Sequence, residues 1–156
     1  MSDFAYLGEC PLFFGLSLEE RAAVYSLCDF HEFGEGETIF AEGARSDLVF
    51  VVCEGAVRIS LETSGAGEEA LTICEPGDSF GEIDLLSENP APRSASAVAH
   101  TACGLATLSR AALVELAARN EGLGYRIARN ALSALGDRIR STNQKIRFFA
   151  VANLFG

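Results

Sequence analysis

A single arginine, Arg93, stands in an otherwise acidic part of the chain. Between residues 59 and 109 the sequence has eight aspartates and glutamates and no other lysine or arginine. A guanidinium stays charged and offers a planar fork of N–H donors that fits phosphate or carboxylate oxygens. In an extended segment Arg93 would share one face with Ala95, Ala97 and Ala99, whose small side chains leave space beside it. These residues predict a site for a small anion.

The segment before this arginine, residues 78–86, carries groups that suit the rest of such a ligand. It predicts a turn into one short helix, and the first N–H groups of a helix attract anions. Gly81 would let a ligand approach the backbone, and the Glu82 carboxylate is a strong acceptor for ligand hydroxyls. The alternative is that Arg93 pairs with a nearby acidic residue and only holds a loop. The residues by themselves favour this plainer interpretation.

Short apolar segments separated by glycines must position these groups. Residues 48–62 predict two strands joined by a turn at Glu54 and Gly55, and further strands are predicted at 70–74, 94–100 and 104–108. Many short strands at about ten-residue spacing indicate a β-barrel or jelly roll rather than a βαβ sheet. Before them, a capping box over residues 17–20 begins a helix that we expect to run to about Asp29.

Helical patterns return near the end of the chain. Ser109 is expected to cap a helix over residues 110–120, and a longer helix is expected from about Glu121 to Phe149. Along the longer helix a seam of residues recurs at alternating spacings of four and three: Ala128, Leu132, Leu135, Ile139, Thr142, Ile146 and Phe149. Such a heptad seam predicts a homodimer through this helix. The alternative is that the helix packs only on its own barrel, and opposite faces can do both.

Length, composition and charge limit the function classes. The 156 residues, 49% apolar and 22% charged, fit one soluble domain over 1–156, with helix and barrel in about 11–120 and the long helix in about 121–149. No apolar run approaches the roughly 18 residues needed to cross a bilayer. The start of the chain lacks the basic flank of a secretory signal, so we expect a cytoplasmic protein without a membrane partner.

The charge is distributed unevenly. Residues 1–125 carry 6 basic and 21 acidic residues, or −15, whereas residues 126–156 carry 6 basic residues and one acidic residue, or +5. An acidic body with a short basic tail is a poor binder of nucleic acid, so no nucleic-acid partner is expected. The five cysteines are odd in number and widely spaced, which is typical of reduced core thiols rather than of a disulfide framework or a metal site.

Residues 80–99, FGEIDLLSENPAPRSASAVA, resemble the phosphate-binding cassette of cyclic nucleotide-binding domains. Residues 30–60 are similar to the glycine-turned strands of that family, and residues 135–146 resemble the long C-helix of its regulators related to the catabolite activator protein. The resemblance runs from about Pro11 to Ile146. It implies an α+β fold, with a β-barrel or jelly roll, an N-terminal helix and a long C-terminal helix.

The resemblance also implies roles for individual residues. Arg93 would bind the exocyclic phosphate oxygens of a cyclic nucleotide, and Glu82 would hold the ribose 2′-hydroxyl. The other implied contacts are backbone N–H groups from Gly81 to Asp84, the backbone and hydroxyl of Ser94, apolar contacts from Val52, Leu71 and Ile83, and adenine contacts from Thr142 and Asn143.

Two departures from the family pattern qualify these roles. Asp84 stands where the family usually has a small residue, and an acid close to a phosphate would cost Coulomb energy. After the C-helix only RFFAVANLFG follows, so we expect a sensor domain without the DNA-binding domain of the family's transcription factors.

The predicted function is a sensor that binds cAMP, or cGMP with lower preference, and acts as a ligand-gated interaction switch on a downstream protein that the sequence leaves unknown. No cofactor is expected besides this ligand. Enzyme chemistry is set aside because His31 and His100 form no metal-binding H-x-H pair and no catalytic motif is found. Two alternatives stay open: an interaction module that keeps the fold without binding nucleotide, and a sensor of another ligand such as a cyclic dinucleotide.

Overall fold

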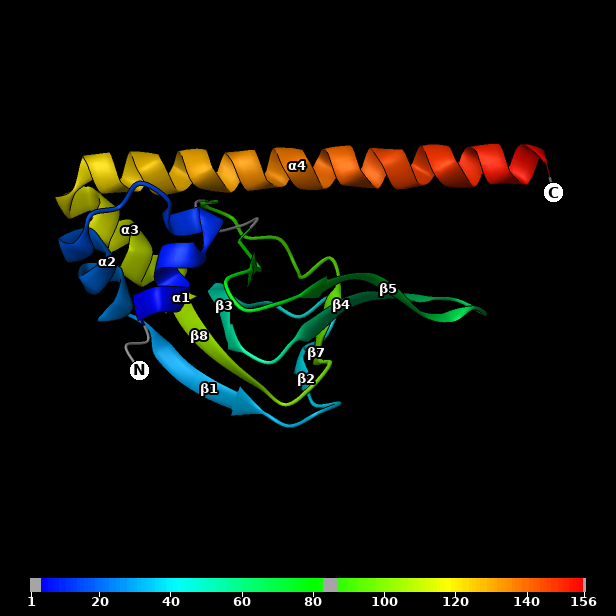
Figure 1. Cartoon of the computed structure of the whole chain (residues 1–156), viewed down its shortest axis with the longest axis horizontal. Helices are drawn as coiled ribbons and strands as arrows, with labels where there is room; N and C mark the ends of the chain where they lie inside the picture. Colours follow the sequence, from blue (N-terminus) through cyan, green and yellow to red (C-terminus); the bar gives the residue numbers. More distant parts are fainter. Residues whose placement is uncertain (1–3, 83–86, 156) are drawn as a thin grey trace.

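The computed structural model describes residues 4–82 and 87–155. Within these residues eight strands are present: β1 Asp29–Phe33, β2 Thr38–Phe40, β3 Leu48–Glu54, β4 Val57–Thr63, β5 Gly67–Cys74, β6 Ser79–Phe80, β7 Ser96–Ala99 and β8 Cys103–Ser109. They pair antiparallel in two four-stranded sheets with the orders β1-β8-β3-β6 and β2-β7-β4-β5. Helices lie at one end of the barrel and a long helix crosses it (Figure 1).

The helices are α1 Phe4–Glu9, the 3-10 helix Pro11–Phe13, α2 Leu18–Tyr25, α3 Arg110–Arg119 and α4 Glu121–Leu154. The predicted helix over residues 17–29 is therefore too long, because Asp29 already pairs with Thr107 as the first residue of β1. The predicted long helix is too short by five residues at its C-terminal end. The predicted α+β class, with an N-terminal helix, a barrel and a long C-terminal helix, is confirmed. None of the helices in the described residues is long and apolar enough to cross a membrane.

Strand β3 shows why a continuous apolar run forms a strand here. Val49, Phe50, Val51 and Val52 are all buried. Val49 and Val51 belong to the core beneath the helices, whereas Phe50 and Val52 belong to the core inside the barrel. Because successive side chains of a strand point to opposite faces, a strand with a core on each side needs apolar residues at every position.

The turn between β3 and β4 confirms the prediction made for Glu54 and Gly55. Gly55 has φ of +74°, and a Cβ atom there would lie 2.1 Å from the carbonyl oxygen of Ala102. A larger residue would need both the disfavoured backbone conformation and a displacement of the neighbouring chain. This position therefore requires glycine.

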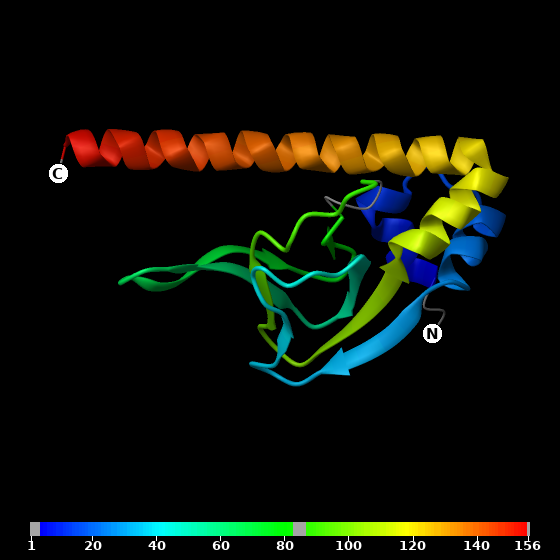
Figure 2. The same cartoon turned by 180° about the vertical axis from the view of Figure 1, so that it is seen from behind.

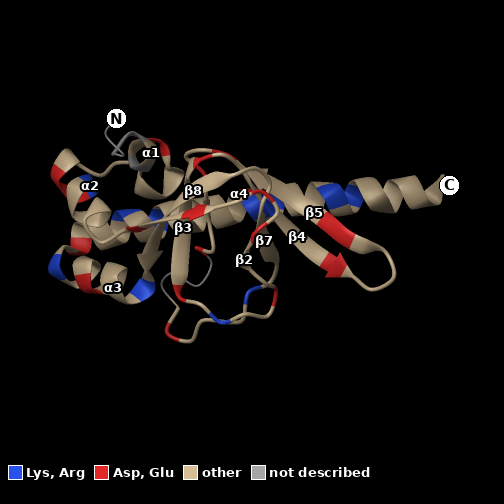
Figure 3. Cartoon of the chain, turned by 90° about the horizontal axis from the view of Figure 1, so that it is seen from below, with Lys and Arg blue, Asp and Glu red and all other residues tan. Residues whose placement is uncertain are grey.

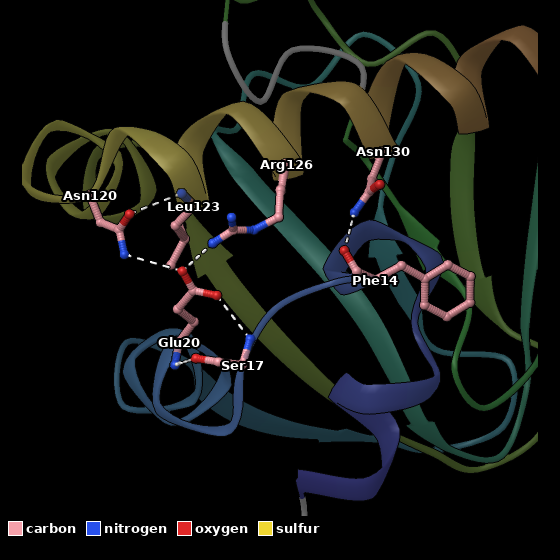
Figure 4. Close-up of polar contacts among 7 residues, drawn as sticks. All are labelled: Phe14, Ser17, Glu20, Asn120, Leu123, Arg126 and Asn130. Carbon is pink, nitrogen blue, oxygen red and sulfur yellow. Dashed lines mark hydrogen bonds and ion pairs between the residues drawn. The ribbon is translucent and has the colours of Figure 1, made fainter.

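The first third of α4 is fixed to the N-terminal helices by a polar network (Figure 4). The capping box is present, since Ser17 Oγ accepts from the Glu20 N–H at 3.2 Å and Glu20 Oε2 accepts from the Ser17 N–H at 2.8 Å. Glu20 Oε1 pairs with Arg126 and accepts from Asn120 Nδ2. Asn130 Nδ2 donates to the carbonyl oxygen of Phe14 at 2.9 Å. One glutamate thus both begins α2 and anchors α4, while Asn130 holds α4 about one turn further along.

This network predicts a pH-dependent effect of Glu20→Gln. The Ser17 N–H and then Arg126 lower the pKa of the Glu20 carboxyl. The ionised Glu20 carboxylate therefore stabilises the folded state at pH values above the ordinary pKa of a glutamate. This stabilisation is lost as the pH falls through the lowered pKa of Glu20. We expect Glu20→Gln to reduce the free energy of unfolding by about 0.5 to 1 kcal/mol at neutral pH and by less in acid.

Urea unfolding at neutral and acidic pH checks this expectation. Glu19→Gln, at the exposed neighbouring position of the same turn, is the matched control. A difference between Glu20→Gln and wild type that is equal at both pH values would contradict the assigned charge interaction.

Candidate ligand site

Arg93 lies just before β7 with its side chain buried. Its Nη1 donates to the carbonyl oxygen of Gly81 at 3.1 Å and its Nη2 donates to the carbonyl oxygen of Leu48 at 2.5 Å. The predicted alternation is confirmed, since Arg93, Ala95, Ala97 and Ala99 are buried. The strand is shorter than predicted, because only residues 96–99 join the ladder with β4. The guanidinium therefore ties the start of β3 to the cassette, residues 80–99.

Aromatic rings surround the charged group of Arg93. Its guanidinium carbon lies 4.6 Å from the ring centroid of Phe40 and 5.9 Å from that of Phe50. The rings of Phe50 and Phe80 stack with centroids 5.0 Å apart. Cation–π attraction offsets part of the cost of burying the charge. The sequence pattern predicted open space beside the alanines and gave no sign of these rings, because they come from three different strands.

Gly81 has a structural role besides the predicted one. Its φ is +78°, and a Cβ atom there would lie 2.7 Å from Arg93 Nη1 and 3.1 Å from the carbonyl oxygen of Leu48. A side chain at this position would therefore push the guanidinium away. The glycine sets the position of Arg93 whether or not a ligand is bound.

Glu82 follows Gly81 directly and is only 4% exposed. Its Oε1 lies 2.8 Å from Nη2 of Arg138, a residue of α4 whose side chain is 42% exposed. Its Oε2 is buried and has no hydrogen-bond partner among residues 4–82 and 87–155. Buried polar atoms are usually satisfied, so an unpaired carboxylate oxygen indicates a position for a donor. Nothing in the helix pattern distinguishes Arg138 from its basic neighbours, so its contact with Glu82 was not predicted.

The remaining predicted site residues are placed as follows. Ser94 is exposed and lies next to Arg93 in the cassette. Thr142 and Asn143 are exposed on α4, one turn beyond Arg138. Ile83 and Asp84 lie outside the described residues. Of the predicted apolar contacts, Val52 is fully buried inside the barrel and Leu71 is 39% exposed on β5.

Two buried thiols lie within electrostatic reach of Glu82. Burial raises the pKa of Cys10 to about 11, with a smaller contribution from the neighbouring charges of Glu82 and Asp78. Burial likewise raises the pKa of Cys74 to about 11, together with the charge of Asp78. Both thiols are free and stay protonated at neutral pH, so they add no negative charge beside a site for an anion.

Charge is separated between α4 and the hairpin formed by β4 and β5 (Figure 3). The hairpin carries acidic residues, whereas the second half of α4 carries mainly basic ones. A hollow of about 440 Å³ lies between the tip of this hairpin and Glu42, with Glu62 as its second acidic residue. Two carboxylates suit a small anion poorly, whereas Arg93, Glu82 and Arg138 bring cationic donors and a buried acceptor together.

Comparison with known proteins agrees with this geometry. The cyclic nucleotide-binding domain model matches residues 30–120. The chain is 31% identical over 141 residues to the CRP-like cAMP-activated global transcriptional regulator of Mycobacterium tuberculosis, which is 90% of this chain and 60% of that protein. This chain therefore spans about 60% of the length of the curated regulator.

Two crystal structures share the fold. A cyclic nucleotide-binding domain from Methylobacillus flagellatus superposes with a TM-score of 0.80 at 26% identity, covering 92% of this chain and 79% of that one. The catabolite activator protein of Thermus thermophilus gives 0.77 at 31% identity, with 90% and 63% covered. This chain belongs to the cyclic nucleotide-binding domain family, and its barrel is the jelly roll of that family.

Proposed function

We propose that this chain is a sensor that binds a cyclic nucleotide, cAMP in preference to cGMP, and uses the ligand to switch a protein interaction. The observation that carries the proposal is the buried Oε2 of Glu82, which has no donor among the described residues and lies next in sequence to the glycine that positions Arg93. A ribose hydroxyl would satisfy this oxygen, and leaving it unpaired costs about 1 to 3 kcal/mol. The guanidinium then meets the phosphate beside it.

To bind the phosphate, Arg93 would replace its hydrogen bonds to carbonyl oxygens by hydrogen bonds to the charged phosphate oxygens. In the structure its two Nη atoms donate to neutral carbonyl oxygens of Gly81 and Leu48. Charge-assisted hydrogen bonds to a phosphate are stronger, and the guanidinium fork matches phosphate geometry. Backbone N–H groups from Gly81 to Asp84, together with Ser94, would complete the contacts.

The preference for cAMP rests on two supports. Thr142 and Asn143 lie on α4 beyond Arg138, where they would face the base and offer both donors and acceptors to adenine. The regulator from Mycobacterium tuberculosis is described as cAMP-activated. The choice of nucleotide would then be made by α4 rather than by the barrel.

The switch would act through Arg138. This residue connects α4 to the carboxylate that would hold the ribose, so a ligand at Glu82 changes the contact that fixes the middle of α4. The N-terminal part of α4 is held separately by Glu20 and Asn130. Ligand binding would therefore shift the population between two positions of the outer helix.

The outer helix would pass the signal to a second copy of the chain. Leu132, Ile139, Ile146 and Phe149 of the predicted seam are between 53% and 70% exposed. An apolar seam of this length on an unpaired helix favours a coiled-coil homodimer. A downstream protein would recognise the arrangement of the helix pair, and the chain itself would carry out no catalysis.

Calorimetric titration tests the proposal directly. We expect cAMP to bind more tightly than cGMP, and the 2′-deoxy analogue of cAMP to bind about tenfold more weakly than cAMP because Glu82 loses its donor. A cyclic dinucleotide serves as the comparison ligand of a different size. Equal affinity of cAMP and its 2′-deoxy analogue would contradict the role of Glu82, and tighter binding of the dinucleotide would identify a different signal.

One observation favours a second candidate function, an interaction module that binds no nucleotide. Arg138 already pairs with Glu82, and Arg93 already donates to two carbonyl oxygens. These internal contacts could be permanent, in which case the cassette would only support α4. Absence of heat for every ligand at millimolar concentration would support this candidate.

A further inference from the structure

The hairpin of β4 and β5 extends beyond the sheet to which it belongs. It projects in the same direction as the C-terminal part of α4 (Figures 1 and 2). β7 pairs with β4 over Val57 to Ser60, and beyond these residues the outer hairpin has no other partner strand in the described part of the chain. Residues 67–73 of β5 are all exposed. A two-stranded hairpin without a third strand is only marginally stable. A further contact at the base of the outer hairpin, near Ser60 where the pairing with β7 ends, would help to hold its position.

One contact between α4 and this hairpin is made at a bulge in β5. Ile59 lies opposite Thr72 and Ser60 lies opposite Ala70, so Leu71 is an extra residue in the ladder. A bulge leaves the extra residue out of regular pairing. The carbonyl oxygen of Leu71 accepts a hydrogen bond from Lys145 Nζ at 2.9 Å.

Lys145 lies on the same face of α4 as Arg138, seven residues and about 10.5 Å further along the helix. The two cations therefore contact different parts of the barrel. Arg138 contacts Glu82 of the cassette, and Lys145 contacts the hairpin. Thr142, a predicted base contact, lies between them on α4. A base that reached Thr142 would therefore lie between the cassette and the hairpin, and these two elements and the helix would bound the mouth of the proposed ligand site.

We propose that Lys145 is a latch that ties the hairpin to α4 across the mouth of the ligand site. The hairpin opens when the Lys145 ammonium leaves the Leu71 carbonyl oxygen and closes when this hydrogen bond re-forms. Its role in ligand exchange rests on the proposed function, whereas its role in holding the hairpin does not. Lys145 is accordingly a positioning residue that sets the rates of ligand entry and exit.

Hydrogen exchange of the ligand-free protein tests the latch itself. Lys145→Met keeps the aliphatic stem and removes the ammonium, and Arg147→Met removes one positive charge two residues further on, also at an exposed position. We expect amide exchange in residues 70–74 to rise by roughly threefold to tenfold in Lys145→Met, with unchanged melting temperature. Arg147→Met and the conservative Lys145→Arg should exchange like wild type. Unchanged exchange in Lys145→Met would overturn the latch.

Release of a fluorescent cAMP analogue tests the role in ligand exchange. Stopped-flow displacement should show dissociation several-fold faster in Lys145→Met than in Arg147→Met or Lys145→Arg, with association faster as well. Faster hydrogen exchange with unchanged ligand rates would overturn the gating role. If no variant and no wild-type protein binds the analogue, the proposed function fails, and the exchange measurement still decides whether Lys145 holds the hairpin.

Discussion

Replacing Arg93 with alanine is expected to weaken cyclic nucleotide binding by about 2 to 5 kcal/mol, which is roughly 30-fold or more in affinity. This is the usual cost of removing one partner of a desolvated charge pair. The buried guanidinium packs against Phe40 and donates to two carbonyl oxygens, so its position beside Glu82 is fixed. Calorimetry with cAMP measures the loss. An Arg93→Ala variant that binds as well as wild type would contradict the site.

Arg93→Ala also removes contacts that hold the fold, so its control has to separate folding from binding. Arg93→Lys keeps the charge and loses the planar fork, and it should fold while binding the phosphate less well. Arg119→Ala removes an exposed arginine that pairs with its helix neighbour Glu115, and it should leave binding unchanged. Thermal unfolding of all three variants identifies any loss of affinity that comes from unfolding.

Leu135→Glu combined with Ile139→Glu is expected to convert a dimer into monomers. Both residues belong to the predicted seam, where Ile139 is 53% exposed and Leu135 is partly buried. A carboxylate in an apolar helix interface would lose its hydration without a partner, which costs several kcal/mol per ion. Light scattering at several protein concentrations measures the change in mass.

The matched control places the same charges elsewhere on α4. Ser133→Glu with Gln144→Glu adds two carboxylates at exposed positions that are not part of the seam, and it should leave the mass unchanged. A wild-type protein that is monomeric at high micromolar concentration, with and without cAMP, would refute the dimer.

The features that were predicted correctly depend on residues close together in the sequence. The capping box at Ser17, the turn at Gly55 and the burial of alternate residues from Arg93 to Ala99 each follow from a local pattern with a local physical cause. The predicted end of α2 at about Asp29 was wrong because it depends on residues that are distant in the sequence. Asp29 to Phe33 form a strand because they pair with β8, seventy or more residues away, and helix patterns carry no information about that partner.

Only part of the candidate site could be predicted from the sequence. Arg93, Gly81 and Glu82 could be proposed because the cassette brings them together within a short segment. The aromatic rings, Arg138 and Lys145 could not, because each comes from an element distant in sequence and meets the site only after the barrel closes. A basic residue on an exposed helix gives no sign of which carbonyl or carboxylate it will reach.

The anchoring of α4 at one end gives the helix the properties of a lever. Asn130 marks the end of the anchored part, Arg138 lies about 12 Å further along, and Leu154 lies about 36 Å along. For a rigid rod pivoting at Asn130, a displacement of 1 Å at Arg138 becomes about 3 Å at Leu154. A change of that size moves an apolar side chain out of register with a partner helix, since the two pack as interlocking knobs and holes. A rearrangement small enough to leave the barrel undisturbed would therefore become a large displacement at the C-terminal end of α4, where a second molecule would contact it.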